Sequence, residues 1–183
     1  ALLTLAPKIF GDIKGRPSHQ IVADAAAMNC CMEHRGGVGY EKNSGDGAGI
    51  LTGLPHSLLQ KVALDNFEKE LPDAGGYGVG NVFLPTDATE REHCKQIIAD
   101  EITAAGQTLI GWRALPTDAD AADVGKAARA AMPHFEQLFI ARGDDRDAQA
   151  FERTLYIIRK LSTHRLRGDE NLTQRHLFYV CSL

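Results

Sequence analysis

Two neighbouring segments hold the residue types that catalysis and ligand binding most often use. The first is EHRGG at 33–37 and the second is SGDGAGIL at 44–51. Their glycines permit backbone conformations with positive φ and a close approach to a ligand. Arg35 and Asp46 add a cation and a carboxylate, and a guanidinium can hold a carboxylate through two parallel hydrogen bonds. These segments are therefore the strongest candidates for a functional site.

The glycine-rich run at 45–49 has only a superficial likeness to a nucleotide-binding fingerprint. Such fingerprints follow a strand and open a helix, so that backbone N–H groups and the helix dipole face the phosphate. Here the expected order is reversed, and no Lys-Ser or Lys-Thr pair completes a P-loop. The pattern disfavours a nucleotide site. Two interpretations stay open, because Arg35 and Asp46 could support a ligand pocket or form a purely structural ion pair.

The other reactive side chains form no recognisable catalytic or metal-binding motif. The four cysteines are Cys30, Cys31, Cys94 and Cys181. The adjacent pair lacks the C-x-x-C spacing of a zinc or redox site, so free thiols in a reducing cytosol are expected. His93 and Cys94 are neighbours on a predicted helix and must point apart, so they are not expected to share a metal ion. No metal site is predicted.

The hydrophobic pattern predicts strands that alternate with helices. A helix is expected to start after Ser18 and to end at Gly36 and Gly37, followed by a loop over 36–49. Further helices are predicted at 55–71, 88–105 and 148–163. Strands are predicted at 2–13, 50–54, 78–84, 107–115, 135–141 and 176–183, and loops at 118–131 and 143–147. This alternation indicates an α/β or α+β layered fold.

Composition excludes several classes of protein. The chain has 183 residues, of which 44% are hydrophobic and 24% charged, a balance typical of a globular domain. With 20 basic and 24 acidic side chains it has no basic field to attract nucleic acid. No run of ~18 apolar residues predicts a membrane span. The final β-type run has no turn or cap after it, so we expect the chain to be a fragment.

Several separate motifs together resemble the amidotransferase domain of glutamate synthase. They are DIKGRPSHQIV (12–22), MEHRGGVG (32–39), SGDGAGIL (44–51), LPH (54–56), YGVGNVFLP (77–85), LIGWRALPTD (109–118), ERTLYIIRK (152–160) and FYVCSL (178–183). The resemblance implies an α+β, N-terminal-nucleophile hydrolase-like αββα layered fold, here incomplete. It also implies that residues 1–183 are the N-terminal portion of a class II glutamine amidotransferase domain, truncated at the C-terminus.

The resemblance implies a reaction as well. In this family an N-terminal cysteine attacks the glutamine amide, with its own free α-amino group as the base, and ammonia is released. The ammonia then adds to 2-oxoglutarate at a second site, where FMN and an iron–sulfur cluster supply electrons. These cofactors belong to the parent enzyme, and none is expected in this chain. The implied partners are glutamine and the remainder of the glutamate synthase chain. The implied location is the cytoplasm, or the plastid of a photosynthetic eukaryote.

The sequence departs from the family at the nucleophile. Counting back from Gly15 without gaps places Leu5 at the cysteine position, and leucine has no nucleophilic atom. The family's carboxylate-binding arginine and its Asn-Gly oxyanion pair lie beyond the end of the matched sequence, and each lost oxyanion donor costs ~10²–10³-fold in rate. Arg35, Gly36 and Asp46 match family motifs and are expected to support the substrate pocket. The chain is therefore expected to be inactive as it stands, with a non-catalytic amidotransferase-like binding or interaction module as the alternative.

Overall fold

The chain divides into two compact units. The computed structural model describes residues 14, 16, 18–32, 34, 36–37, 39–41, 43, 49, 52–143 and 147–183. The smaller unit comprises Ala1–Ile50 and Ala119–Ala130, and the larger comprises Leu51–Asp118 and Ala131–Leu183.

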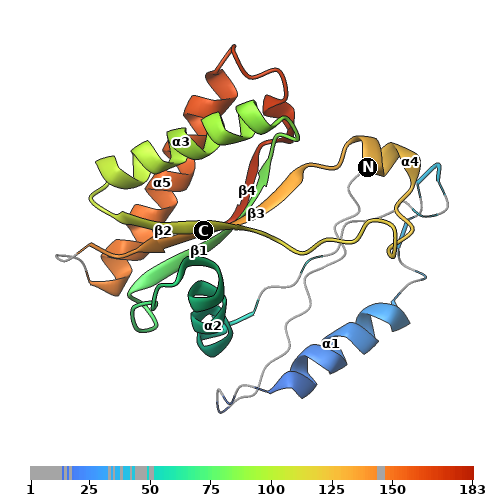
Figure 1. Ribbon diagram of the computed structural model, residues 1–183. Coiled ribbons are helices and arrows are strands. Elements are labelled where there is room, and N and C mark those ends of the chain that lie inside the picture. Colours follow the sequence, from blue (N-terminus) through green and yellow to red (C-terminus); the bar gives the residue numbers. More distant parts are fainter. Residues whose placement is uncertain are drawn as a thin grey trace. The chain divides into compact units, whose positions relative to one another are not determined.

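The larger unit is built on an antiparallel sheet of four strands (Figure 1). They are β1 (Tyr77–Leu84), β2 (Thr108–Ala114), β3 (His134–Ala141) and β4 (Tyr179–Ser182), in the order β2-β3-β1-β4. β1 and β3 pair along their whole length, and β2 and β4 form the two edges. The predicted strands at 78–84, 107–115 and 135–141 are confirmed, and so is the α+β class. Within the described ranges the strands form this one sheet, so the second sheet of an αββα arrangement stays a prediction.

Helices cover both faces of this sheet. α3 (Ala88–Ala104) and α5 (Ala148–Gly168) lie together on one face, and α2 (His56–Phe67) lies on the other (Figure 1). Asp87 and Asp147 are the N-caps of α3 and α5. Their carboxylates accept the N–H groups of Glu90, at 2.9 Å, and Ala150, at 2.7 Å. Each cap satisfies a backbone donor that has no partner inside its helix.

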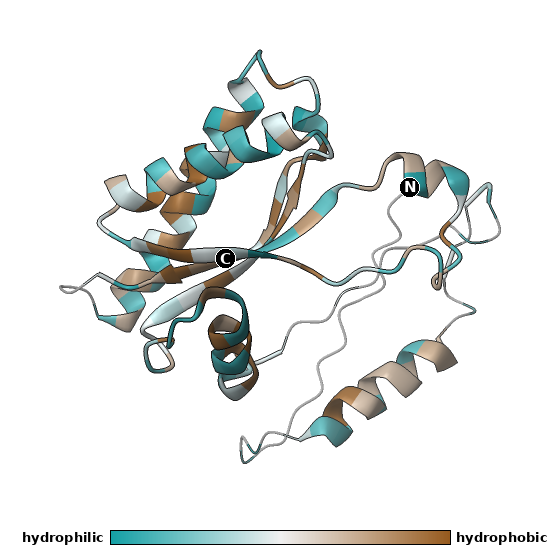
Figure 2. Cartoon of the chain, in the orientation of Figure 1, coloured by the Kyte–Doolittle hydropathy of each residue, from teal (hydrophilic) through white to brown (hydrophobic). Residues whose placement is uncertain are grey.

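The main core lies between the sheet and the pair formed by α3 and α5. Alternate residues of β1 and β3 point into it, because successive side chains of a strand face opposite sides. Figure 2 shows the strands largely apolar and the outward side of α3 largely hydrophilic. The buried members of this core are Val82, Leu84, Cys94, Ile97, Ile98, Ile102, Leu138, Ile140, Phe151, Leu155, Ile158, Leu166, Leu172, Phe178 and Val180. A smaller cluster under α2 contains Leu59, Ala63, Leu71, Tyr77 and Phe139.

Two glycines allow the helices to approach the sheet closely. A Cβ atom on Gly78 would lie 2.5 Å from Cδ1 of Leu155 in α5. A Cβ atom on Gly111 would lie 2.7 Å from the ring of Phe67 in α2. A glycine inside a strand often marks such a close approach. Both positions therefore set the distance between helix and sheet.

The smaller unit contains α1 (His19–Cys31) and α4 (Lys126–Ala130). Ser18 caps α1 as predicted, and its hydroxyl accepts the Gln20 N–H at 3.2 Å. The predicted helix end at Gly36 and Gly37 is wrong. α1 ends at Cys31, where the Met32 N–H donates to the Asn29 carbonyl oxygen, three residues back, at 3.1 Å.

Other boundaries also differ from the predictions. α2 ends at Phe67 rather than 71, because Glu68 adopts the left-handed conformation, with φ of 54°. α5 continues past 163 to Gly168, since Leu166 extends its buried stripe. Residues 52–54 form no strand, and a short 3₁₀ helix, η2 (Arg175–Leu177), precedes β4. The strand predicted at 2–13, and residues 50–51 of the other, lie outside the described residues.

Candidate functional site

Most of the residues predicted to surround the substrate lie outside the described part of the chain. Leu5, Arg35 and Asp46 are all among these. Gly36 is described, and it is exposed and belongs to no helix or strand. The described positions of the predicted 36–49 loop likewise have no regular secondary structure, which agrees with the prediction of a loop there.

Two side chains of this loop bind the segment 119–130, which is distant in sequence but belongs to the same unit. Glu41 accepts the Ala127 N–H through its two carboxylate oxygens, at 3.1 and 3.0 Å. Asn43 donates from Nδ2 to the carboxylate of Asp123. A Cβ atom on Gly125 would collide with the Glu41 carboxylate, so a larger residue there would displace that side chain. These contacts attach residues 41 and 43 to the turn and helix at 119–130.

The prediction of a loop over 118–131 missed this segment. Its helix α4 has the sequence KAARA, whose residues have high intrinsic helix propensity. Arg129 pairs with Asp120 at 2.8 Å and donates to the Ala119 carbonyl oxygen at 2.9 Å, which holds the preceding turn against the helix. Within the segment 118–131, the composition of KAARA was the feature that could have indicated a helix. The contact of this helix with Glu41 could not be recognised from the local sequence, because the two residues that it joins are 86 positions apart.

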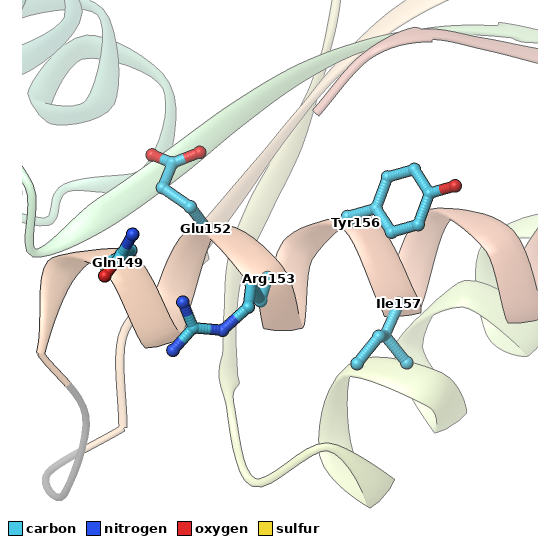
Figure 3. Close-up of a pocket in the computed structure, with 5 residues that line it drawn as sticks. All are labelled: Gln149, Glu152, Arg153, Tyr156 and Ile157. Carbon is cyan, nitrogen blue, oxygen red and sulfur yellow. The ribbon is translucent and has the colours of Figure 1, made fainter.

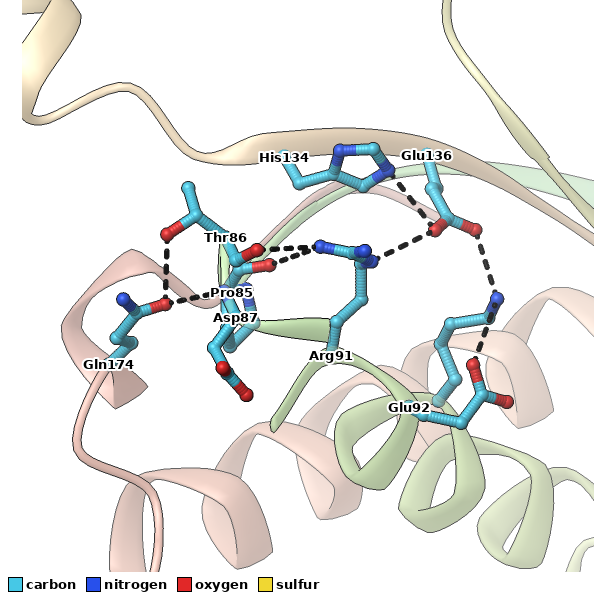
Figure 4. A network of polar contacts seen from close by, with 9 residues as sticks. Pro85, Thr86, Asp87, Arg91, Glu92, His134, Glu136 and Gln174 are labelled. Atoms are coloured by element: carbon cyan, nitrogen blue, oxygen red, sulfur yellow. Dashed lines mark hydrogen bonds and ion pairs between the residues drawn. The ribbon is translucent and has the colours of Figure 1, made fainter. Parts of the chain in front are cut away.

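A buried carboxylate organises a polar network in the larger unit (Figure 4). Glu136 of β3 is 6% exposed. Its oxygens lie 3.3 Å from Lys95 Nζ, 3.3 Å from His134 Nε2 and 3.9 Å from Arg91 Nε. Arg91 also donates to two backbone carbonyl oxygens that follow β1, those of Pro85 and Thr86. Breaking a buried ion pair of this kind is costly, so the network holds α3 on β3.

The described contacts of this network stabilise the fold and include no pair of nucleophile and base. Lys95 Nζ also lies 3.5 Å from the Glu92 carboxylate and 5.6 Å from the centre of the Trp112 ring. An activated nucleophile would need a hydroxyl or thiol within hydrogen-bond reach of a base. The contacts around Glu136 join carboxylates to lysine, arginine and histidine side chains instead. The arrangement neutralises a buried charge and fixes the side chains around it.

Two further carboxylates join α3 to the segment before β4. Glu90 accepts the Thr173 hydroxyl at 2.5 Å and the Gln174 N–H at 2.9 Å, and these hydrogen bonds lower the pKa of Glu90. Nε2 of His93 lies 2.8 Å from the Asp169 carboxylate, and this contact lowers the pKa of Asp169. Hydrogen bonds to the charged form of a carboxylate favour that form. Both groups therefore hold the segment 169–174 against α3 in their ionised state.

Burial makes the two cysteines of the larger unit poor nucleophiles. Cys94 is fully buried in the main core, and desolvation raises its pKa to about 12. Burial also raises the pKa of Cys181. The thiolate is the nucleophilic form of cysteine, so neither residue is suited to attack an amide. The other two cysteines, Cys30 and Cys31, are exposed on α1.

His93 and Cys94 point apart, as predicted. Cys94 packs into the core, while His93 is exposed and contacts Asp169. Among the residues that the structure describes, no three His, Cys, Asp or Glu side chains form a group that could hold a metal ion. Over the same residues, no helix has both the length and the apolar character needed to cross a membrane.

Comparison with known proteins identifies what this chain is similar to. The family model for class II glutamine amidotransferases matches residues 8–183. A chloroplastic ferredoxin-dependent glutamate synthase of Oryza sativa subsp. japonica is 38% identical over 173 residues, which are 94% of this chain and 10% of that protein. The NADPH glutamate synthase large chain of Bacillus subtilis (strain 168) is 35% identical over 176 residues, which are 96% of this chain and 11% of that protein. The NADH glutamate synthase of Schizosaccharomyces pombe is 36% identical over 177 residues, covering 93% of this chain and 8% of that protein. The chain thus spans about a tenth of the length of these relatives.

Proposed function

Because this chain belongs to the class II glutamine amidotransferases, we propose that it is part of the domain of a glutamate synthase that releases ammonia from glutamine. The ammonia would pass to 2-oxoglutarate elsewhere in the parent enzyme. The observation that carries this proposal is the extent of the match. Glutamate synthases of a plant, a bacterium and a fission yeast align with 93–96% of the chain.

We propose that the chain with this sequence does not hydrolyse glutamine. Leu5 takes the position of the family's cysteine, and a leucine side chain forms no thioester. Cys94 cannot replace it, because its pKa of about 12 keeps the thiol protonated at neutral pH. Burial raises the pKa of Cys181 too, which weakens that thiol as a substitute.

Arg35, Gly36 and Asp46 serve in this proposal as support for the substrate pocket. The contacts of Glu41 and Asn43, which lie between Gly36 and Asp46 in the sequence, favour such a role, since they attach these two positions to the segment 119–130. A loop with a fixed backbone can hold a binding group in place without reordering when the ligand arrives.

A layered αββα fold would place a second sheet against the face of the described sheet that carries α2. On this face Phe83 and Phe135 pack at 4.9 Å between ring centres, and Tyr179, 6.3 Å from Phe83, is 47% exposed. The exposed ring of Tyr179 beside this aromatic pair is apolar surface that a further layer would cover. Residues 1–183 would then be the N-terminal portion of the domain.

The cofactors of the parent enzyme lie outside this chain in our proposal. An iron–sulfur cluster usually takes four cysteine thiolates. Cys94 is sealed in an apolar core, while Cys30 and Cys31 are neighbours on the exposed helix α1, so the cysteines do not fit such a cluster. FMN and the cluster would serve the synthase site instead. The proposed location is the cytoplasm, or the plastid if the source is a photosynthetic eukaryote, since several relatives are named as chloroplastic.

One observation favours a second candidate function. A leucine at the nucleophile position is also expected in a non-catalytic amidotransferase-like module. A module of this kind keeps the fold and uses it for binding or interaction. Such a module could bind glutamine or a protein partner without turnover.

Ammonia release from glutamine tests the proposal directly. We expect the 183-residue chain, incubated with excess glutamine, to release ammonia no faster than buffer alone. Equilibrium dialysis with isotopically labelled glutamine separates the two candidates, because a binding module retains the label and an incomplete catalytic domain does not. Steady ammonia release by the chain would overturn the proposed inactivity and leave the family assignment intact.

A further inference from the structure

The outward face of α5 carries large apolar side chains where a surface helix is usually polar. Tyr156, Ile157 and Leu161 are 57%, 49% and 49% exposed. Ile157 and Leu161 are four residues apart, so they lie on one side of the helix one turn from each other. We define the outer α5 face as Arg153, Tyr156, Ile157, Lys160 and Leu161.

The outer α5 face is not needed for the packing of the larger unit. The opposite side of α5 supplies Phe151, Leu155 and Ile158 to the main core, and all three are buried. Single exposed apolar residues are common, but a contiguous apolar patch on a surface usually marks an interaction site.

The side chains of this face border a shallow, open depression on the surface of α5. Gln149, Glu152, Arg153, Tyr156 and Ile157 line this depression, which is largely open to solvent (Figure 3). Figure 3 shows these side chains projecting from successive turns of α5. A shallow depression with an aromatic and an aliphatic wall can accept an apolar side chain of a partner protein.

The charges around this patch favour an acidic partner. The exposed residues Arg153, Lys160 and Arg167 carry three positive charges, and Glu152 carries one negative charge, which leaves a local excess of +2 in a chain whose net charge is −4. Lys160 Nζ lies 5.8 Å from the centre of the Tyr156 ring, so positive charge borders the apolar centre. Two copies paired through this face would bring like charges together, and like charges across an interface oppose association.

We propose that the outer α5 face docks onto a surface of the same glutamate synthase polypeptide that has an apolar centre and a rim of Asp and Glu. This inference rests on the proposed function. The relatives of this chain are about ten times its length, so most of such a polypeptide lies outside these 183 residues and can supply the partner surface.

Site-specific photo-cross-linking in the full polypeptide that carries this sequence tests the proposal. The variant Ile157→p-benzoylphenylalanine places a cross-linker at the centre of the patch. We expect an intramolecular cross-link to an Asp- and Glu-rich segment outside residues 8–183. The matched control is Ala104→p-benzoylphenylalanine, at an exposed position at the end of α3, which is expected to give no such product.

The charge requirement is tested by adding Lys160→Glu to the Ile157 probe. We expect the cross-link yield to fall ~tenfold, as for loss of an important interface contact. The same reversal at Lys61, exposed on α2, is expected to leave the yield unchanged. Circular dichroism melting of both variants confirms that they are folded.

Three outcomes would overturn the docking proposal. The first is a cross-link yield from the probe at position 157 that is no higher than the yield from the probe at position 104. The second is a cross-linked product that joins two copies of the polypeptide through α5. The third is a cross-link yield from position 157 that Lys160→Glu does not lower. Glutamine hydrolysis is measured separately. The polypeptide used for this assay lacks residues 1–4 and has Leu5→Cys as its first residue. If it gives the expected cross-link but does not hydrolyse glutamine, the result counts against the proposed function alone, and if it hydrolyses glutamine without the cross-link, the result counts against docking alone.

Discussion

Replacing Gly78 by alanine tests how closely α5 packs on the sheet. The new Cβ atom would lie 2.5 Å from Cδ1, 3.1 Å from Cδ2 and 3.4 Å from Cγ of Leu155. Leu155 is 3% exposed in the main core, where side chains are closely packed, so it can shift only by displacing its neighbours. Overpacking of this kind costs ~1–3 kcal/mol. We therefore expect Gly78→Ala to lower the free energy of unfolding by about that amount.

The same contact predicts how a second substitution combines with the first. Leu155→Ala alone removes buried methyl groups and costs ~2–5 kcal/mol. In the double variant the alanine methyl at 78 occupies part of the space that Leu155 leaves. The loss should therefore be smaller than the sum of the two single losses, by a coupling of ~0.5–3 kcal/mol, the range found for residues in contact.

Urea denaturation measures these losses, with fluorescence of the single tryptophan, Trp112, as the probe, since it lies in the same unit. Gly168→Ala is the matched control. A Cβ atom there meets nothing within 4 Å, and alanine has the higher helix propensity, so stability should stay the same or rise by up to ~1 kcal/mol. A neutral Gly78→Ala, or strictly additive losses in the double variant, would refute the packing of α5 on β1.

Three further predictions follow from single residues. Cys94, with a pKa of about 12, should react with iodoacetamide at pH 8 only after unfolding, whereas exposed Cys30 should react in the folded chain, as peptide mass mapping would show. The lowered pKa of Asp169 means that the folded chain binds this proton less readily than the unfolded chain. Its contribution to stability should therefore be complete above its ordinary value of 3.8 and be lost as the pH falls below it. His93→Ala should reduce this dependence, measured as urea midpoints between pH 6 and pH 3, and an unchanged dependence would contradict the assignment. Asp87→Ala should cost ~1 kcal/mol through loss of the α3 cap, and an unaltered thermal midpoint would argue against that cap.

The sequence predicted best those elements whose pattern is local and repetitive. α5, β1, β2 and β3 were placed because their apolar residues recur with helical or strand period over seven residues or more. Helix ends were less predictable. Nothing in the composition of 55–71 indicates that Glu68 turns left-handed and ends α2.

Long-range contacts account for the remaining errors. The helix α4 has only five residues, and the carboxylate that meets its first turn comes from Glu41, so a pattern within 118–131 could not reveal it. The apolar run at 50–54 has the composition of a strand, yet residues 52–54 have no strand partner. Pairing between segments, rather than composition, decides whether such short runs become strands.

The prediction of the candidate site relied on the resemblance to a family rather than on local sequence patterns. The membership predicted from eight dispersed motifs is confirmed by the family match over residues 8–183. The roles of Leu5, Arg35 and Asp46 come from that resemblance alone and stay predictions, since these residues lie outside the described part of the chain.

Intact mass after exposure to a diazoketone analogue of glutamine tests the central claim most directly. Such an electrophile alkylates a nucleophilic cysteine that lies in a glutamine-binding pocket. The chain as it stands should keep its mass, because Leu5 offers no nucleophile. A full polypeptide that carries this sequence, lacks residues 1–4 and has Leu5→Cys as its first residue also supplies the rest of the pocket, so this variant should gain one adduct, mapped to that cysteine. An adduct on the unaltered chain, or none on the variant with the N-terminal cysteine, would contradict the account.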